Sequence, residues 1–312
     1  MFGMDPLLNM AALLFAGLLF SRLIKLLKLP NVTGFLVGGL IIGPSVLGLL
    51  STQGVESLGL ISSVALGFIA FSIGSEFKIS YFKRVGFLPI VIATFESLFA
   101  VVFVVAALAA AGQTLPFSLV LGAIAAATAP AATIMVIKQY RAKGPVTETL
   151  LSVVALDDAT ALIFFGIAVA IAQALESPQH ASLLFSVLSP VLQILAALGI
   201  GLALGAAHTL LIRFLPARHN RLVLTIAFVL TATAVAELLG LSALLTTMAM
   251  GAVFANFCKQ SAQVMELTDR FTNPIYMMFF VLSGAGLNLS ILPSIGLVGV
   301  IYVVVRVLGK MA

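Results

Sequence analysis

The stretch LLSVVALDDATALIFFGIAVAIA, residues 150–172, places two adjacent aspartates, Asp157 and Asp158, in the middle of an otherwise apolar segment. The apolar halves on either side of the pair predict one membrane-spanning helix over about residues 146–175. An ionised carboxylate at the bilayer centre costs roughly 2.5–3.5 kcal/mol on insertion scales, so such residues are rare and usually mark ion or proton pathways. Two of them in succession are hard to explain by packing alone.

The composition of the chain is that of a membrane protein. Of its 312 residues, 62% are hydrophobic and only 9% are charged, and the mean hydropathy is +1.22. A spanning helix needs about 20 mostly apolar residues, and the polar breaks leave eleven candidates, which predict an all-α, polytopic membrane protein. These segments are 5–27, 32–49, 56–77, 86–111, 116–139, 146–175, 182–212, 221–239, 241–257, 270–289 and 293–312.

The basic residues report the orientation of the chain in the membrane. Lysines and arginines cluster after the first, third, fifth and seventh segments, Lys259 and Arg270 bracket a polar stretch after the ninth, and the intervening loops carry none. This alternation is the positive-inside pattern. It places the N-terminus outside a cell (inner) membrane and predicts a cytoplasmic loop over 258–270. The net charge of +5 therefore reports topology and not a nucleic-acid partner.

The fifth segment contains a predicted break. Residues 128–133 read TAPAAT, with Pro130 at mid-span between the hydroxyls of Thr128 and Thr133. Proline removes one backbone hydrogen bond and clashes with the carbonyl four residues earlier. Broken backbone at this depth is tolerated only where protein or a water-filled cavity surrounds it, and many transporters present such helix ends to ions. The alternative is a simple proline kink.

Successive residues of a helix point about 100° apart, so Asp157 and Asp158 cannot face the same partner. One carboxylate can face a cavity and bind an ion, while the other needs a cationic partner on a neighbouring helix. A buried carboxylate that exchanges a proton for a metal cation is the minimum chemistry of an antiporter.

Other charged residues of the apolar segments are candidate partners for this pair. Arg306 and Lys310 share a helix face four residues apart, unless both simply extend to the cytoplasmic headgroups. Glu96 lies some ten residues into its segment and could relay protons or pair with a polar core residue. The chain has neither a zinc-protease HExxH motif nor a G-x-S-x-G elbow, so we expect a transporter without cofactor and not an enzyme.

Several motifs, in order, resemble the monovalent cation:proton antiporter superfamily in its second branch. They are LLKLPNVTGFLVGGLIIGPSVLGLL at 26–50, LGLISSVALGFIAFSIGSEF at 58–77, TAPAAT at 128–133, LDDA at 156–159, FTNPIYMMFFVLSGAGLNL at 271–289 and RVLGK at 306–310. The resemblance covers essentially the whole chain.

The resemblance implies a thirteen-helix fold of two inverted six-helix repeats around a linker helix. About eleven of those helices would be present, with 1–312 as a membrane transport domain that is incomplete at its C-terminal end. The implied parts are a mobile core (86–175 and 293–312), a scaffold that forms a homodimer (5–77 and 221–289) and the linker helix (182–212).

The resemblance also implies roles for individual residues. Asp158 would bind cation and proton alternately, Asp157 would pair with Lys310, and Thr128 would line the site. The implied activity is sodium:proton exchange by alternating access in the lipid bilayer, in its electrogenic Asp-Asp form. Lithium or potassium as the cation stays open, and potassium:proton efflux is the nearest alternative. A sodium-coupled solute symporter and a passive ion channel are alternatives of another class.

Overall fold

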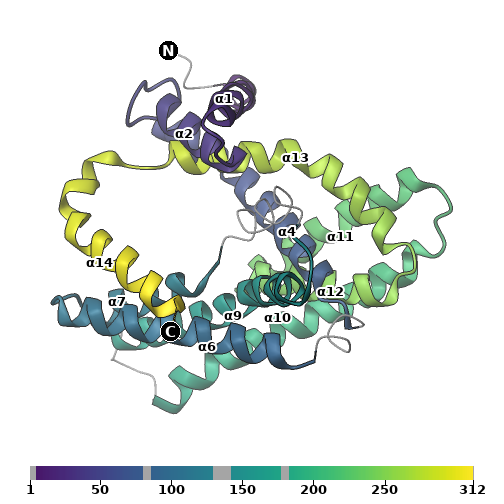
Figure 1. The fold of residues 1–312 in the computed structure, drawn as a ribbon. Helices are drawn as coiled ribbons and strands as arrows, with labels where there is room; N and C mark the ends of the chain where they lie inside the picture. The colour runs from purple at the N-terminus through teal and green to yellow at the C-terminus, as the bar shows by residue number, and fades with distance from the viewer. Residues whose placement is uncertain (1–4, 80–85, 129–141, 177–182, 312) are drawn as a thin grey trace.

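A computed structural model describes residues 5–79, 86–128, 142–176 and 183–311, and within these ranges the protein is helical with no β-strand. The helices, labelled as in Figure 1, are α1 (Pro6–Leu26), α2 (Asn31–Ile42), α3 (Thr52–Ser57), α4 (Gly59–Glu76), α6 (Leu88–Ala110), α7 (Leu115–Ala126), α9 (Pro145–Glu176), α10 (Leu183–Ile212), α11 (Arg218–Leu238), α12 (Ala243–Phe257), α13 (Ser261–Ala285), the short 3-10 helix η1 (Leu289–Ile291) and α14 (Leu292–Met311).

Each of the eleven predicted segments contains a helix, and two boundaries were predicted wrongly. The second segment was expected to run to 49, but α2 ends at Ile42, directly before Gly43 and Pro44. The loop expected over 258–270 is mostly helical, because α13 already begins at Ser261. Val264, Thr268 and Thr272 recur every four residues on its buried face, so packing along one face extends this polar segment as a helix.

Four of the described helices are long and apolar enough to cross a membrane, as judged by length and composition. They are α1, α6, residues 192–212 of α10, and α11. Shorter apolar helices occur at α2, at 59–75 in α4, at α7 and at α12.

The helices pack in two groups. In the first group, α6 contacts α7, α9 and α14, while α7 also contacts α9 and α14. In the second group, α1 and α2 pack on α13, and α4 and α11 pack on α12 and α13. Helix α10 bridges the groups by contacting both α9 and α12, and α4 also touches α9. Figure 1 shows α14, in yellow, ending beside α6 and α7.

Glycines set the closest helix crossings of the second group. Where α2 crosses α13, a methyl group on Gly39 would overlap the carbonyl of Val281, and one on Gly284 would overlap the carbonyl of Leu36. Gly39 therefore packs on the backbone three residues before Gly284, and Gly284 packs on the backbone three residues before Gly39. Small residues at such crossings let helix backbones approach closely within a membrane.

The crossing of α4 and α12 repeats this arrangement. Gly251 of α12 faces the carbonyl of Phe71, and Gly74 of α4 faces the carbonyl of Met248. The offset is again three residues on both sides. The crossing of α12 with α4 thus has the same geometry as the crossing of α2 with α13. Such a correspondence is expected of two inverted repeats.

The glycine crossings lead to a stability prediction. Gly39→Ala should strongly lower the melting temperature of the purified protein in detergent, since its methyl group meets backbone that cannot rotate away. Overpacking of this kind typically costs about 1–3 kcal/mol. Gly199→Ala in α10 is the matched control, because nothing lies within 4 Å of an added methyl group there. Equal melting temperatures for the two variants would contradict the proposed close crossing.

Candidate functional site

The carboxylate of Asp157 lies at the meeting point of four helices. Asp157 is only 1% exposed on α9, and its Oδ2 accepts a hydrogen bond from Lys310 Nζ of α14 at 2.8 Å. The hydroxyl of Thr128, just beyond α7, donates to the same oxygen. Ser97 of α6 donates to Oδ1 at 2.5 Å. Both carboxylate oxygens are thus occupied, as a buried charge requires.

The break in the fifth segment is the feature that brings Thr128 to this carboxylate. Helix α7 ends at Ala126, and the next residue, Ala127, is extended with φ −61° and ψ 140°. A continuing helix would press the ring of Pro130 against the carbonyl of Ala126. The sequence therefore stops the helix one turn before the proline, and the chain turns toward α9.

Arg306 satisfies the carbonyls that this break leaves open. Its Nε donates to the carbonyl of Ala125 at 3.1 Å, and its Nη2 donates to that of Ala127 at 2.5 Å. The last carbonyls of a helix have no partner within the helix, and a buried end without partners is costly. Arg306 thus acts as a cationic cap supplied by a distant helix.

Lys310 contacts two carboxylates at once. Besides Asp157, it lies 3.2 Å from Glu96 Oε1, and its side chain is 14% exposed. It also donates to Thr128 Oγ1 at 2.5 Å. In the structure both side chains bind groups of other helical segments, which favours the partner role over the alternative of extension to the headgroups. Their spacing on one face of α14 lets Arg306 hold the helix break while Lys310 reaches the carboxylate.

Sequence reasoning missed two hydroxyl residues of the site. Ser97 is fully buried, and its oxygen lies 3.0 Å from Thr160 Oγ1, which itself donates to the backbone carbonyl of Asp157 at 3.0 Å. A serine directly after Glu96, and a threonine three residues after Asp157, were the available signals. Both are common in helix interiors of membrane proteins, so neither was distinctive.

Two predicted site residues lie outside the described part of the chain. They are Thr133 and the side chain of Asp158. Among the residues that the structure does describe, no group of three or more His, Cys, Asp or Glu could hold a metal ion. The described site is instead a single ion-pair network of Asp157, Lys310, Glu96, Thr128 and Ser97.

Comparison with known proteins agrees with this fold. The family model for the transmembrane part of sodium/hydrogen exchangers matches residues 10–312. The sodium proton antiporter MjNhaP1 from Methanocaldococcus jannaschii, solved at pH 8, superimposes with a TM-score of 0.76 and 21% identity over 97% of this chain and 77% of that one. A second structure of it, from an electron-microscopy map, gives 0.75 and 20% over 95% and 73%. No curated protein matches the chain.

The chain belongs to the sodium/hydrogen exchanger family, because the family model covers nearly all of it. The hypothesis of a multi-pass antiporter drawn from the sequence is thereby confirmed at the level of family and fold. The family consists of transporters, its substrates are sodium and protons, and neither potassium efflux nor solute symport is favoured.

The contact between Asp157 and Lys310 leads to a testable coupling. Lys310→Ala should lower the melting temperature in detergent, because it leaves a buried carboxylate without its cation; removing one partner of a buried pair costs about 3–5 kcal/mol. Asp157→Asn in the same chain should recover much of that loss. A double-mutant cycle of melting temperatures measures the coupling, and additive losses would argue against it.

Ser97 should affect the sodium dependence of ion exchange. Ser97→Ala removes one donor from Asp157 Oδ1, and a hydrogen bond to a charged group is worth about 1.5–3 kcal/mol. We expect a shifted sodium dependence of exchange in proteoliposomes. Ser118→Ala is the control, since among the described residues that buried hydroxyl bonds only to the carbonyl of Thr114, at 2.9 Å. Identical sodium dependence in both variants would remove Ser97 from the site.

Proposed function

We propose that sodium and protons compete at Asp158, and that Asp157 with Lys310 forms the charge-balancing pair beside it. The observation that carries the proposal is the buried carboxylate of Asp157, which a lysine and two hydroxyls hold at a helix break. Successive residues of a helix project about 100° apart around the helix axis. Asp158 can therefore face an ion path while Asp157 stays among its partners.

Lys310 can leave Asp157 without losing every counter-charge. Both oxygens of Asp157 are occupied while Lys310 is bound, so a cation that also uses this carboxylate must displace the ammonium group. Glu96 already lies 3.2 Å from it and can retain it. The hydroxyl of Thr128 is then released to turn its oxygen toward the cation. Thr133 would supply a second hydroxyl oxygen to the cation.

We propose alternating access by movement of the first packing group against the second. We assign α6, α7, α9 and α14 to the mobile core, the helices from α1 to α4 and from α11 to α13 to the scaffold, and α10 to the linker. Support comes from the contacts, which are extensive within each group and join the groups mainly along α10 and α9. Proton and sodium share one carboxylate, so either gradient can drive the other.

We place the protein in the cell (inner) membrane with its N-terminus outside, as a homodimer through the scaffold. Support for the orientation is the alternation of basic loops. We also propose electrogenic exchange, because the adjacent Asp157 and Asp158 match the paired carboxylates of electrogenic members of the antiporter superfamily.

Asp158→Asn should abolish exchange. In proteoliposomes with a pH-sensitive dye inside, adding sodium should move protons for the native chain and not for the variant, because an amide cannot bind a proton and sodium in turn. Adding potassium in a parallel assay tests the choice of cation. Adding a permeant lipophilic cation, which collapses the membrane potential, should accelerate electrogenic exchange.

The same assay separates the alternatives. Exchange retained by Asp158→Asn, with normal insertion and melting temperature, would remove Asp158 from its role. Proton movement that occurs with potassium but not with sodium would mean that potassium is the exchanged cation. Sodium flux without proton movement would indicate a channel or symporter. A rate that is unaffected by collapse of the membrane potential would mean electroneutral exchange.

A further inference from the structure

Phe77, which directly follows α4, packs against both groups of helices. On one side it lies against an apolar cluster contributed by α4, α10 and α12, which consists of Ala70, Ala197, Leu245 and Met248. On the other side it lies against a cluster contributed by α6 and α9, which consists of Ala93, Val153 and Leu156. One aromatic side chain therefore lies between the scaffold and the core.

The core cluster lies within about one helical turn of the ion-pair network, as measured along each helix. Leu156 directly precedes Asp157 on α9, and Ala93 precedes Glu96 by three residues on α6. Both helices begin after basic stretches of the chain, which are the stretches that mark the cytoplasmic side. Phe77 thus lies on the cytoplasmic side of the buried carboxylate.

Asn256 of α12 holds the backbone at Phe77. Its Nδ2 donates to the carbonyl of Phe77 at 2.6 Å, and its Oδ1 accepts from the amide of Ile79 at 2.7 Å. Its Nδ2 also donates to the carbonyl of Ala252 at 2.7 Å. The side-chain amide thus faces two acceptors and one donor, so all of its bonds are satisfied in this orientation. The segment that carries Phe77 is thereby fixed to the scaffold.

The second repeat holds its equivalent segment in a similar way. The amide of Phe77 donates to the carbonyl of Gly74, three residues earlier, at 3.1 Å. At the equivalent glycine of the other crossing, the amide of Leu287 donates to the carbonyl of Gly284 at 3.2 Å. Ser45, after α2, then donates to the carbonyl of Leu287 at 2.6 Å. A side chain that holds this carbonyl is therefore a feature of both repeats, whereas the phenylalanine packed against α6 and α9 belongs to the first.

We propose that Phe77, positioned by Asn256, closes the cytoplasmic route to Asp157 in this conformation. An apolar constriction stops a hydrated ion because water is not stable within it. A cation from the cytoplasm reaches the carboxylate only after α6 and α9 have moved away from Phe77. The inference rests on the proposed function, in which these helices move against the scaffold, and it names the scaffold residue at the closed contact.

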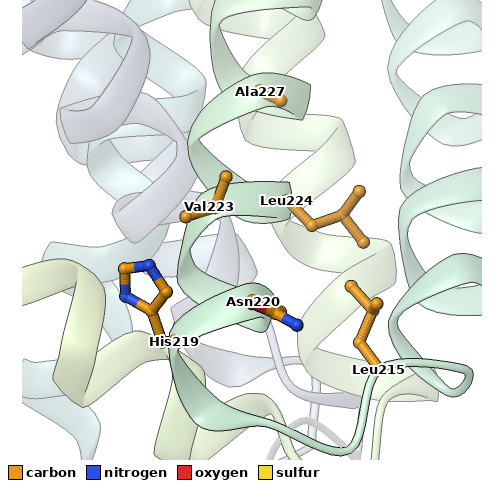
Figure 2. Close-up of a pocket in the computed structure, with 6 residues that line it drawn as sticks. All are labelled: Leu215, His219, Asn220, Val223, Leu224 and Ala227. Carbon is orange, nitrogen blue, oxygen red and sulfur yellow. The ribbon is translucent and has the colours of Figure 1, made fainter.

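The scaffold offers a matched control for the loss of an apolar side chain. A pocket at the start of α11 is lined by Leu215, His219, Asn220, Val223, Leu224 and Ala227. Figure 2 shows Leu215 and Leu224 pointing toward one another across it. Leu224 also packs against an apolar cluster that joins α4, α11 and α12. Leu224→Ala therefore loosens the scaffold at a place that is remote from the contact between Phe77 and the core.

The test measures how fast a thiol beside Phe77 reacts from the cytoplasmic side. Ala93→Cys supplies the thiol in a chain with Cys258→Ser, since the native chain has one cysteine. A charged, membrane-impermeant methanethiosulfonate is added to inside-out vesicles. Phe77→Ala should raise the rate of labelling several-fold by opening the constriction, and Asn256→Ala should raise it by releasing the segment. Phe77→Leu should leave labelling slow, because it keeps the apolar bulk.

Two controls separate this effect from general loosening. Leu224→Ala, and Ser45→Ala in the other repeat, should leave labelling as slow as in the parent chain. The inference is overturned if Phe77→Ala labels at the parent rate, if either control labels as fast as Phe77→Ala, or if the increase appears in right-side-out vesicles instead. If Phe77→Ala does not fold, Asn256→Ala decides by the same criteria.

Labelling requires no ion exchange, so the outcome is independent of the test of the proposed function. Loss of exchange in Asp158→Asn with unchanged labelling in Phe77→Ala would overturn the closure at Phe77 alone. Retained exchange in Asp158→Asn with fast labelling in Phe77→Ala would overturn the role of Asp158 and support the closure.

Discussion

A carboxylate held away from water is the constraint on which the rest of this structure depends. Asp157 is almost completely buried, and an ionised carboxylate at such a position is stable only if paired and hydrogen-bonded. Its donors come from three other helical segments: Ser97 from α6, Thr128 from the end of α7 and Lys310 from α14. The need to satisfy one charge therefore fixes how four segments meet.

The broken helix and the carboxylate are parts of one arrangement because α14 holds both. Arg306 caps the open carbonyls after α7, and one turn later Lys310 reaches Asp157. A shift of α14 that frees Lys310 also pulls on the cap of α7, and with it on Thr128. The pairing of Asp157 and the cap of α7 are in this way linked through one helix.

Both helix groups contain close glycine crossings, and the first group also contains a buried polar network. In the second group, glycine crossings between α2 and α13 and between α4 and α12 bring backbones into direct contact, which leaves little freedom for sliding. The first group also has a close crossing, where Gly309 of α14 meets the backbone of Ala100 of α6. Its centre, however, holds the ion pairs and hydrogen bonds of Asp157. This polar centre is the part of the protein to which we assign ion exchange in the proposed function.

The sequence by itself determined the helical segments, the acidic pair within an apolar segment, the break before Pro130 and the family. Hydropathy, the geometry of proline and the cost of a charge in lipid all act locally, so a linear pattern reveals them. Only the tertiary structure decided that Ser97 binds Asp157, that Glu96 shares Lys310, that Arg306 caps α7 and that α13 begins at Ser261. These contacts join residues far apart in the chain, or depend on a face buried by another helix, and no local pattern specifies which distant partner packing will supply.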